Sequence, residues 1–166
     1  MKLTIEQLNG MDRSAFMDAV GWVAEHSPWV MERVYDKLPY RNRDELHEKL
    51  VDVIHHLSEH EQLALLRSHP DLGTRLQMTE ASVSEQRGAG LDSLSEEEYR
   101  LLLDLNERYT SRFGFPFIMA VKGKRKSEVI EAMRRRSGNE REGELKTALG
   151  EIGRITRFRL SERVEH

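Results

Sequence analysis

This chain of 166 residues contains no cysteine. Disulfide bonds, thiolate metal sites and cysteine nucleophiles are therefore excluded. No apolar run approaches the roughly 20 residues that a membrane-spanning helix needs, and the N-terminus lacks the apolar core of a signal peptide. Hydrophobic residues make up 38% of the chain and charged residues 33%, which is ordinary for a soluble helical protein. We therefore expect one domain, residues 1–166, in a reducing compartment.

Strand-like alternation is also nearly absent. The exception is Phe-Gly-Phe-Pro-Phe-Ile at 113–118, where Pro116 forbids a central strand and no partner strand is evident. We expect this stretch to be an extended segment packed across helices. Elsewhere apolar residues recur at helical spacing, and capping boxes are indicated at Thr4-x-x-Gln7 and Ser95-x-x-Glu98. The pattern predicts an all-α fold, a single helical-bundle domain of about eight helices.

The net charge of −3 is unevenly distributed along the chain. Residues 122–166 carry 13 Lys and Arg against 8 Asp and Glu, whereas residues 1–121 carry 13 against 21. The basic end includes Arg134-Arg135-Arg136 and most simply indicates a solvated face. A nucleic-acid surface is disfavoured because no aromatic residues interleave with these charges. An anionic small-molecule substrate, attracted by local positive potential, also fits.

Two short polar stretches hold residues suited to proton transfer. In His69-Pro70-Asp71-Leu72-Gly73 the proline disfavours the α conformation for the histidine, so we expect its ring on the rim of a turn. A plain turn residue is the alternative. Ser82-x-x-Glu85 is itself a capping box, so Glu85 has a structural alternative as well. A helix N-terminus is nevertheless a ready anion site, in which Ser82, Glu85 and Gln86 have both roles.

One C-terminal arginine is expected to face the core. Leu145, Leu149 and Ile152 define an apolar stripe, and Arg159 returns to within roughly 40° of it at 100° per residue. Arg157 lies roughly 120° away and should face solvent. A cation on the core side is costly unless it is paired. Arg159 therefore pairs with a buried acid or meets an anionic ligand, unless it snorkels at a frayed helix end.

A metal site is not predicted. His56 and His60 are four residues apart on one helix, as in zinc sites, but the sequence is not His-Glu-x-x-His and no third ligand is evident.

Ordered motifs along most of the chain resemble those of the OHCU decarboxylase family of uric acid degradation, where OHCU is 2-oxo-4-hydroxy-4-carboxy-5-ureidoimidazoline. The resemblance spans Ser27 to Leu160, and each motif is weak alone, whereas the ordered set is specific. The matching motifs are Ser27-Pro28-Trp29-Val30, His69-Pro70-Asp71-Leu72-Gly73, Ser82-x-x-Glu85-Gln86 with Gly88-Ala89-Gly90-Leu91, Asn106-x-x-Tyr109-x-x-Arg112 running into residues 113–118, and Ile155-x-x-x-Arg159-Leu160.

The resemblance implies an all-helical homodimer that decarboxylates OHCU to (S)-allantoin without a metal or organic cofactor. It implies that His69 is the catalytic proton donor, with Glu85 and Arg159 as the other catalytic residues. The substrate-binding set would be Pro70, Ser82, Gln86, Phe117, Ile118, Met119, Ala120 and Val121, the last five through their backbone.

Two alternatives remain open at this stage. The chain could be a non-catalytic helical binding module that uses its basic C-terminal region, or an enzyme of the same fold acting on another ureido or carboxylate substrate. The sequence ends Val164-Glu165-His166 without a Ser-Lys-Leu peroxisomal signal, so we expect a cytoplasmic protein. No nucleic acid or membrane partner is expected.

Overall fold

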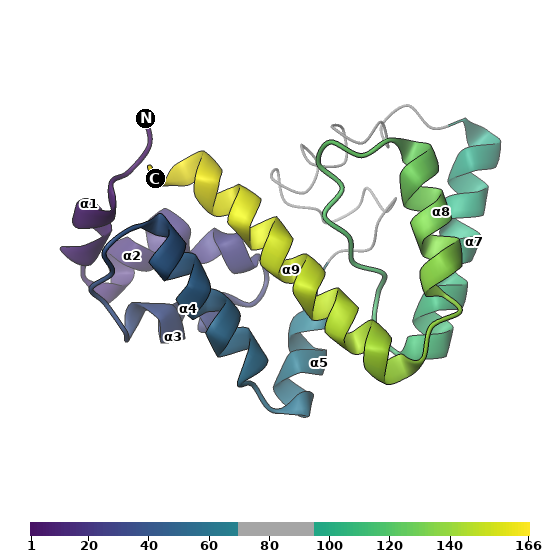
Figure 1. Cartoon of the computed structure of the whole chain (residues 1–166), viewed down its shortest axis with the longest axis horizontal. Helices are drawn as coiled ribbons and strands as arrows, with labels where there is room; N and C mark the ends of the chain where they lie inside the picture. The colour runs from purple at the N-terminus through teal and green to yellow at the C-terminus, as the bar shows by residue number, and fades with distance from the viewer. Residues whose placement is uncertain (70–94) are drawn as a thin grey trace. The chain divides into compact units, whose positions relative to one another are not determined.

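The computed structural model describes residues 1–69 and 95–166 (Figure 1). Within these ranges the chain forms eight α-helices and one short 3₁₀ helix (η1), and its β-structure is confined to a single parallel bridge between Leu3 and Val164. The predicted all-α fold is confirmed. The elements are α1 (Ile5–Asn9), α2 (Arg13–Val20), η1 (Gly21–Ala24), α3 (Pro28–Tyr35), α4 (Arg43–His55), α5 (Glu59–Ser68), α7 (Glu96–Phe113), α8 (Lys126–Arg136) and α9 (Arg141–Arg163).

None of the described helices combines the length and apolar character that crossing a membrane requires.

The helix starts follow the capping residues in the sequence. Both predicted capping boxes are formed: the side chain of Thr4 accepts from the Gln7 N–H, and that of Ser95 accepts from the Glu98 N–H. Hydrogen bonds from the backbone N–H of Ser95 and from Lys126 hold the pKa of Glu98 at about 2. Local sequence therefore sets where these helices begin, before any tertiary packing.

The chain divides into two compact units, and the first comprises Met1–Leu65 together with Gly153–His166. Its core is apolar, and two backbone hydrogen bonds, from the Leu3 N–H to Arg163 and from the Glu165 N–H to Leu3, tie its two chain ends together. The imidazole Nε2 of His47 in α4 donates to the Gly153 carbonyl in α9 at 2.8 Å. The buried core side chains include Phe16, Val30, Val34, Leu46, Leu50, Ile54, Ile155 and Leu160.

The second unit, Leu66–Ile152, contains α7, α8 and the first half of α9. Its centre is a group of buried aromatic rings contributed by the end of α7 and the residues that follow it. The ring of Tyr109 lies 4.6 Å from that of Phe113 and 5.2 Å from that of Phe117, centroid to centroid, while Phe113 and Phe115 stack at 5.9 Å. Such rings contribute large buried areas, so this cluster anchors the chain between α7 and α8.

The segment after α7 differs from its prediction in where it starts. Phe113 is the last residue of α7, and Gly114 ends the helix in the left-handed conformation at φ 80°, with its N–H on the Thr110 carbonyl at 2.8 Å. Glycine adopts this conformation without a Cβ clash, which explains the boundary. Residues 115–121 are neither helix nor strand. Their extended conformation stays a prediction.

Two glycines should respond oppositely to alanine. At Gly114 an added Cβ would meet only ordinary contact, 3.6 Å from Arg67, but the positive φ strains any L-residue. We expect Gly114→Ala to lower the free energy of unfolding by about 1–2 kcal/mol. The matched control, Gly150→Ala inside α9, has open space and should raise it by about 0.5–1 kcal/mol. Urea denaturation measures both, and a neutral Gly114→Ala would contradict the assignment of strain.

Candidate active site

His69 lies in a bend directly after α5. Its backbone N–H donates to the Leu66 carbonyl at 3.2 Å, and its side chain is half-buried. α5 thus ends one residue before His69, whose α conformation is disfavoured by the proline that follows it. The other predicted residues of the two polar stretches, Pro70, Ser82, Glu85 and Gln86, lie outside the described residues.

The chain beside His69 is bonded to the segment that follows α7. The guanidinium Nε of Arg67 donates to the Gly114 carbonyl at 2.8 Å. Arg67 is two residues before His69, and Gly114 immediately precedes residues 115–121. One hydrogen bond thus links the residues just before His69 to those just before residues 117–121.

Residues 117–121 are placed with their side chains mostly inside the protein. Phe117, Ile118, Ala120 and Val121 are buried, and only Met119 is intermediate. What such a segment can offer to a ligand is its backbone and the Met119 side chain. The binding role of this segment through its backbone stays a prediction.

A buried carboxylate lies behind this segment. Glu144 in α9 is completely buried, and its Oε1 accepts hydrogen bonds from the Tyr109 hydroxyl and from Arg136 Nε, both at 2.5 Å. Its Oε2 accepts from the Asn139 amide at 3.0 Å. Burial, together with the bond to Glu144, raises the pKa of Tyr109. The phenol therefore stays protonated at neutral pH and acts as a hydrogen-bond donor.

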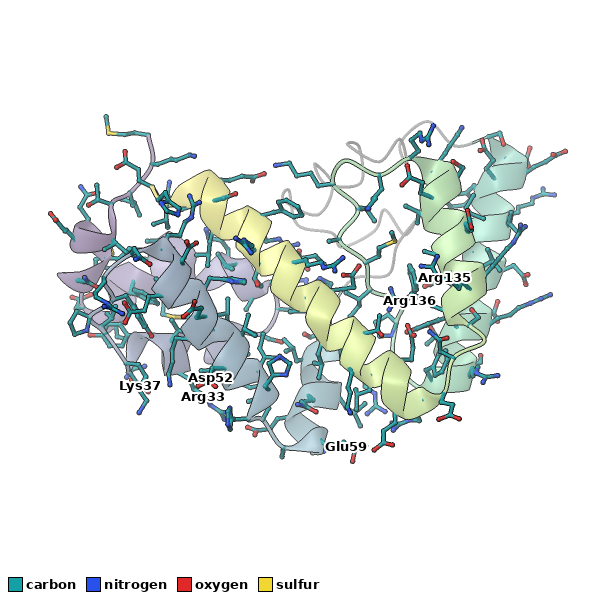
Figure 2. The ribbon with its side chains drawn as sticks, in the orientation of Figure 1. Arg33, Lys37, Asp52, Glu59, Arg135 and Arg136 are labelled. Carbon is teal, nitrogen blue, oxygen red and sulfur yellow. The ribbon has the colours of Figure 1, made fainter. Side chains whose placement is uncertain are left out.

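Arg136 also contacts the segment itself. Its Nη1 donates to the Ile118 carbonyl at 2.7 Å, and its guanidinium lies 4.4 Å from the centroid of the Phe117 ring. Figure 2 shows Arg136 near the C-terminal end of α8, on the side of this segment.

The burial of Arg136 was not predicted from the sequence, because Arg134-Arg135-Arg136 was interpreted as one solvated face. Arg134 and Arg135 are exposed, but Arg136 is only 5% exposed. The signal was available: Arg136 follows the buried Val129 and Met133 by seven and three residues, which places it on the same helix face.

Arg159 is buried and paired with an acid, one of the two outcomes that its position on the apolar stripe left open. Its Nη2 lies 2.8 Å from Glu25 Oε1, its Nη1 donates to the Val23 carbonyl at 3.2 Å, and both side chains of the ion pair are 1% exposed. Arg157 is exposed, as expected. Glu25 has a positive φ of 51°, a strained conformation for a residue with a Cβ. Arg159 therefore stabilises an unusual turn after η1.

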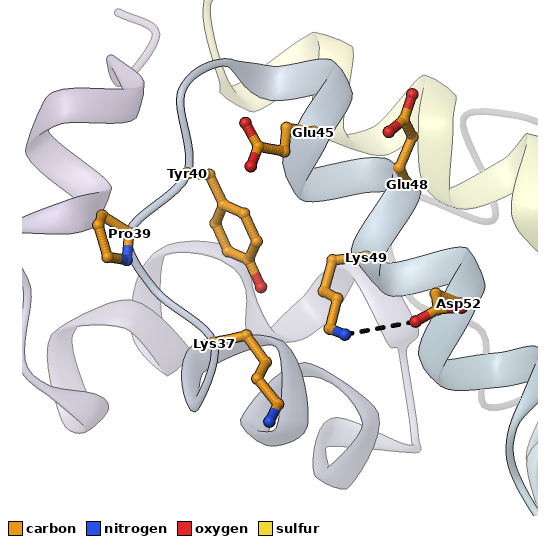
Figure 3. Close-up of a pocket in the computed structure, with 7 residues that line it drawn as sticks. All are labelled: Lys37, Pro39, Tyr40, Glu45, Glu48, Lys49 and Asp52. Atoms are coloured by element: carbon orange, nitrogen blue, oxygen red, sulfur yellow. Dashed lines mark hydrogen bonds and ion pairs between the residues drawn. The ribbon is translucent and has the colours of Figure 1, made fainter.

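A groove in the first unit does not coincide with these residues. It has a volume of about 480 Å³ and is lined by Lys37, Pro39, Tyr40, Glu45, Glu48, Lys49 and Asp52 (Figure 3). Lys49 and Asp52, three residues apart in α4, form an ion pair on one side of it at 3.3 Å. The Tyr40 hydroxyl donates to the Val34 carbonyl, and burial raises its pKa. Five of its seven lining residues are charged, whereas small-molecule sites are lined mainly by hydrophobic and aromatic side chains with few charged groups.

His55, His56 and His60 are exposed, and Nδ1 of His56 bonds back to the Asp52 carbonyl at 2.8 Å. In the part of the chain that the structure describes, no three His, Asp or Glu side chains group as metal ligands.

Comparison with known proteins gives the same family as the motifs do. The OHCU decarboxylase family profile matches residues 9–161, nearly the whole chain. The chain belongs to the OHCU decarboxylase family. It is 46% identical to the 2-oxo-4-hydroxy-4-carboxy-5-ureidoimidazoline decarboxylase of Haloferax volcanii, over 98% of this chain and 96% of that protein.

Two further proteins to which the chain is similar are longer than it is. It is 44% identical to the uric acid degradation bifunctional protein of Bacillus subtilis, where the match covers 96% of this chain and 32% of that one. A crystal structure of (S)-allantoin synthase superimposes with a TM-score of 0.82 at 25% identity, over 98% of this chain and 54% of the other. The OHCU decarboxylase fold of this chain is therefore also found as part of larger proteins.

The Arg159–Glu25 pair can be tested for a structural role. Arg159→Met leaves a carboxylate buried without its cation, so we expect it to lower the free energy of unfolding by about 3–5 kcal/mol. Combining it with Glu25→Gln removes the stranded charge and should restore most of that loss. Urea denaturation of the single and double variants gives the coupling. Wild-type stability in Arg159→Met would show that the pair does not support the fold.

Proposed function

We propose that this chain is a carboxy-lyase that converts OHCU to (S)-allantoin in the degradation of urate. The observation that carries the proposal is the family match over residues 9–161, joined by 46% identity to a decarboxylase of almost the same length. The names of the Bacillus relative and of the superimposed allantoin synthase support the pathway and the product.

The reaction makes a limited demand on the protein. When the bond to the carboxylate breaks and CO₂ leaves, an electron pair remains on the ring carbon. The adjacent C=N bond of the substrate takes up that pair, so the substrate supplies its own electron sink. The enzyme must orient the carboxylate for departure. One proton must then add to one face of the neighbouring, ureido-bearing carbon while the hydroxyl on the first carbon becomes a carbonyl, and this addition sets the S configuration.

We assign the delivery of this proton to His69. Imidazole is the side chain best suited to deliver a proton near neutral pH, and its place at the end of α5, beside the Arg67–Gly114 bond, supports the choice. Glu85 is assigned to orient the histidine or to accept from the hydroxyl and ureido groups of the substrate.

Arg159 is assigned to offset the negative charge of the substrate and intermediate. This assignment comes from the family resemblance, and its ion pair with Glu25 is the structural role described above. Because Glu25 already neutralises part of the positive charge of Arg159, it sets how strongly the guanidinium can attract an anionic substrate.

The remaining polar contacts are assigned to Pro70, Ser82 and Gln86, and to the backbone of residues 117–121. The burial of Phe117, Ile118, Ala120 and Val121 supports a backbone role for this segment. A homodimer, a cytoplasmic location and a single functional domain over residues 1–166 remain part of the proposal. Sedimentation, cell fractionation and limited proteolysis test these three points in turn.

The activity is tested by adding purified protein to freshly made OHCU, generated by oxidising urate and hydrolysing the product, and following circular dichroism. Spontaneous decay yields racemic allantoin, so we expect rapid growth of the signal of the S enantiomer. A signal no faster than the protein-free blank, with the protein folded, would contradict the decarboxylase. Salt-sensitive binding to an acidic partner in that case would favour the binding-module alternative.

Removal of the His69 imidazole should abolish turnover without loss of the fold. We expect His69→Ala to lower kcat by about 100-fold or more, the usual contribution of a positioned acid or base. The matched control is His60→Ala, at an exposed position early in α5, the helix that precedes His69, and it should keep wild-type activity. Far-ultraviolet circular dichroism checks that both variants are helical. Near-wild-type activity in His69→Ala would reject its catalytic role.

A further inference from the structure

We propose that Arg136 is a positioning residue of the decarboxylase: it fixes the peptide between Ile118 and Met119 so that the Met119 N–H is presented to an oxygen of the substrate. This inference rests on the proposed function. It adds a residue that makes no contact with substrate itself and acts through the backbone that it holds.

The first observation is the way Arg136 is locked in place. Its Nε bonds Glu144 and its Nη1 bonds the Ile118 carbonyl, so two edges of one rigid guanidinium are fixed at once. The Phe117 ring packs against the plane of the same group. A carbonyl oxygen held by a buried, charged donor has little freedom to turn, because breaking such a bond leaves both groups unsatisfied.

The second observation is where the other side of that peptide points. Leu38–Pro39 is the cis peptide bond among the described residues, so the Ile118–Met119 bond is trans. Across a trans peptide, the C=O and the following N–H point in opposite directions. With the Ile118 carbonyl aimed at Arg136, the Met119 N–H is aimed away from Arg136.

The third observation is that this donor is available. The Met119 N–H has no acceptor among the described residues, although buried backbone donors are nearly always paired. Met119 is also the residue of 117–121 that is not buried. A ureidoimidazoline has carbonyl and carboxylate oxygens, which are the acceptors such an N–H would bind.

Arginine is required here by geometry rather than by charge alone. A guanidinium has separate donors on Nε and Nη1, which reach the carboxylate and the carbonyl simultaneously. A lysine has one nitrogen at a single point, so it can keep the ion pair with Glu144 while losing the hold on Ile118. Arg136→Lys therefore separates the two roles.

The test measures initial rates of (S)-allantoin formation over a range of OHCU concentrations for Arg136→Lys. We expect KM to rise about tenfold, the effect of one charge-assisted hydrogen bond, with kcat within about twofold of wild type. The enantiomeric excess of the product should fall, because a substrate held less firmly can take the proton on either face.

Tyr109→Phe is the matched control for stability. It removes a hydrogen bond from the same Glu144 oxygen but keeps the ring against Phe117 and the Arg136–Ile118 bond. We expect it to lower the melting temperature while KM and enantiomeric excess stay at wild-type values. An equal rise in KM in Tyr109→Phe would overturn the proposal, since general loosening of the cluster would then explain both variants.

A second variant covers the case in which Arg136→Lys does not fold. Arg136→Gln combined with Glu144→Gln leaves no buried charge unpaired, and the shorter glutamine loses the bond to Ile118. It should show the same rise in KM. Wild-type KM and stereoselectivity in a folded Arg136 variant would overturn the inference and leave the decarboxylase intact, whereas an inactive wild-type protein would instead overturn the proposed function.

Discussion

The second unit of this protein depends on one buried carboxylate. Glu144 is completely removed from solvent, and an ionised carboxylate in that position is stable only if donors surround it. The donors come from three places: Tyr109 in α7, Arg136 at the end of α8 and Asn139 in the turn before α9. Because each of these hydrogen bonds is costly to break, they restrict how α7, α8 and α9 pack against one another. The position of the chain between α7 and α8 depends on the same packing.

That constraint extends from the core to the residues assigned to chemistry. Arg136 in turn fixes the Ile118 carbonyl by a hydrogen bond. Arg67, which lies two residues before the histidine that we assign as proton donor, bonds Gly114 at the start of the same segment. Between these bonds, the phenylalanines hold the segment by burial. A loop without regular hydrogen bonding is thus held from its interior side by buried side chains and by hydrogen bonds at Gly114 and Ile118.

In the first unit the corresponding element is the ion pair between Arg159 and Glu25. It holds a residue with positive φ at the end of η1, and local strain of this kind persists only where the surroundings enforce it. An arginine of the family motif therefore supports the fold in this chain, and any action on an anionic substrate is exerted by a cation whose charge is already shared with a carboxylate.

Local sequence determined much of the fold by itself. Capping boxes at Thr4 and Ser95 and the apolar stripes depend on side chains a few residues apart, and helical spacing alone placed Arg159 on the core side of its helix. The partners of Arg159 and Arg136 were decided only by tertiary structure. Arg159 meets Glu25, which is 134 residues away along the chain, and Arg136 meets Glu144 from the next helix, eight residues away. The run Arg134-Arg135-Arg136 shows the difference: helical spacing places the third arginine on the face of Val129 and Met133, and only the tertiary structure supplies the buried carboxylate that it needs there.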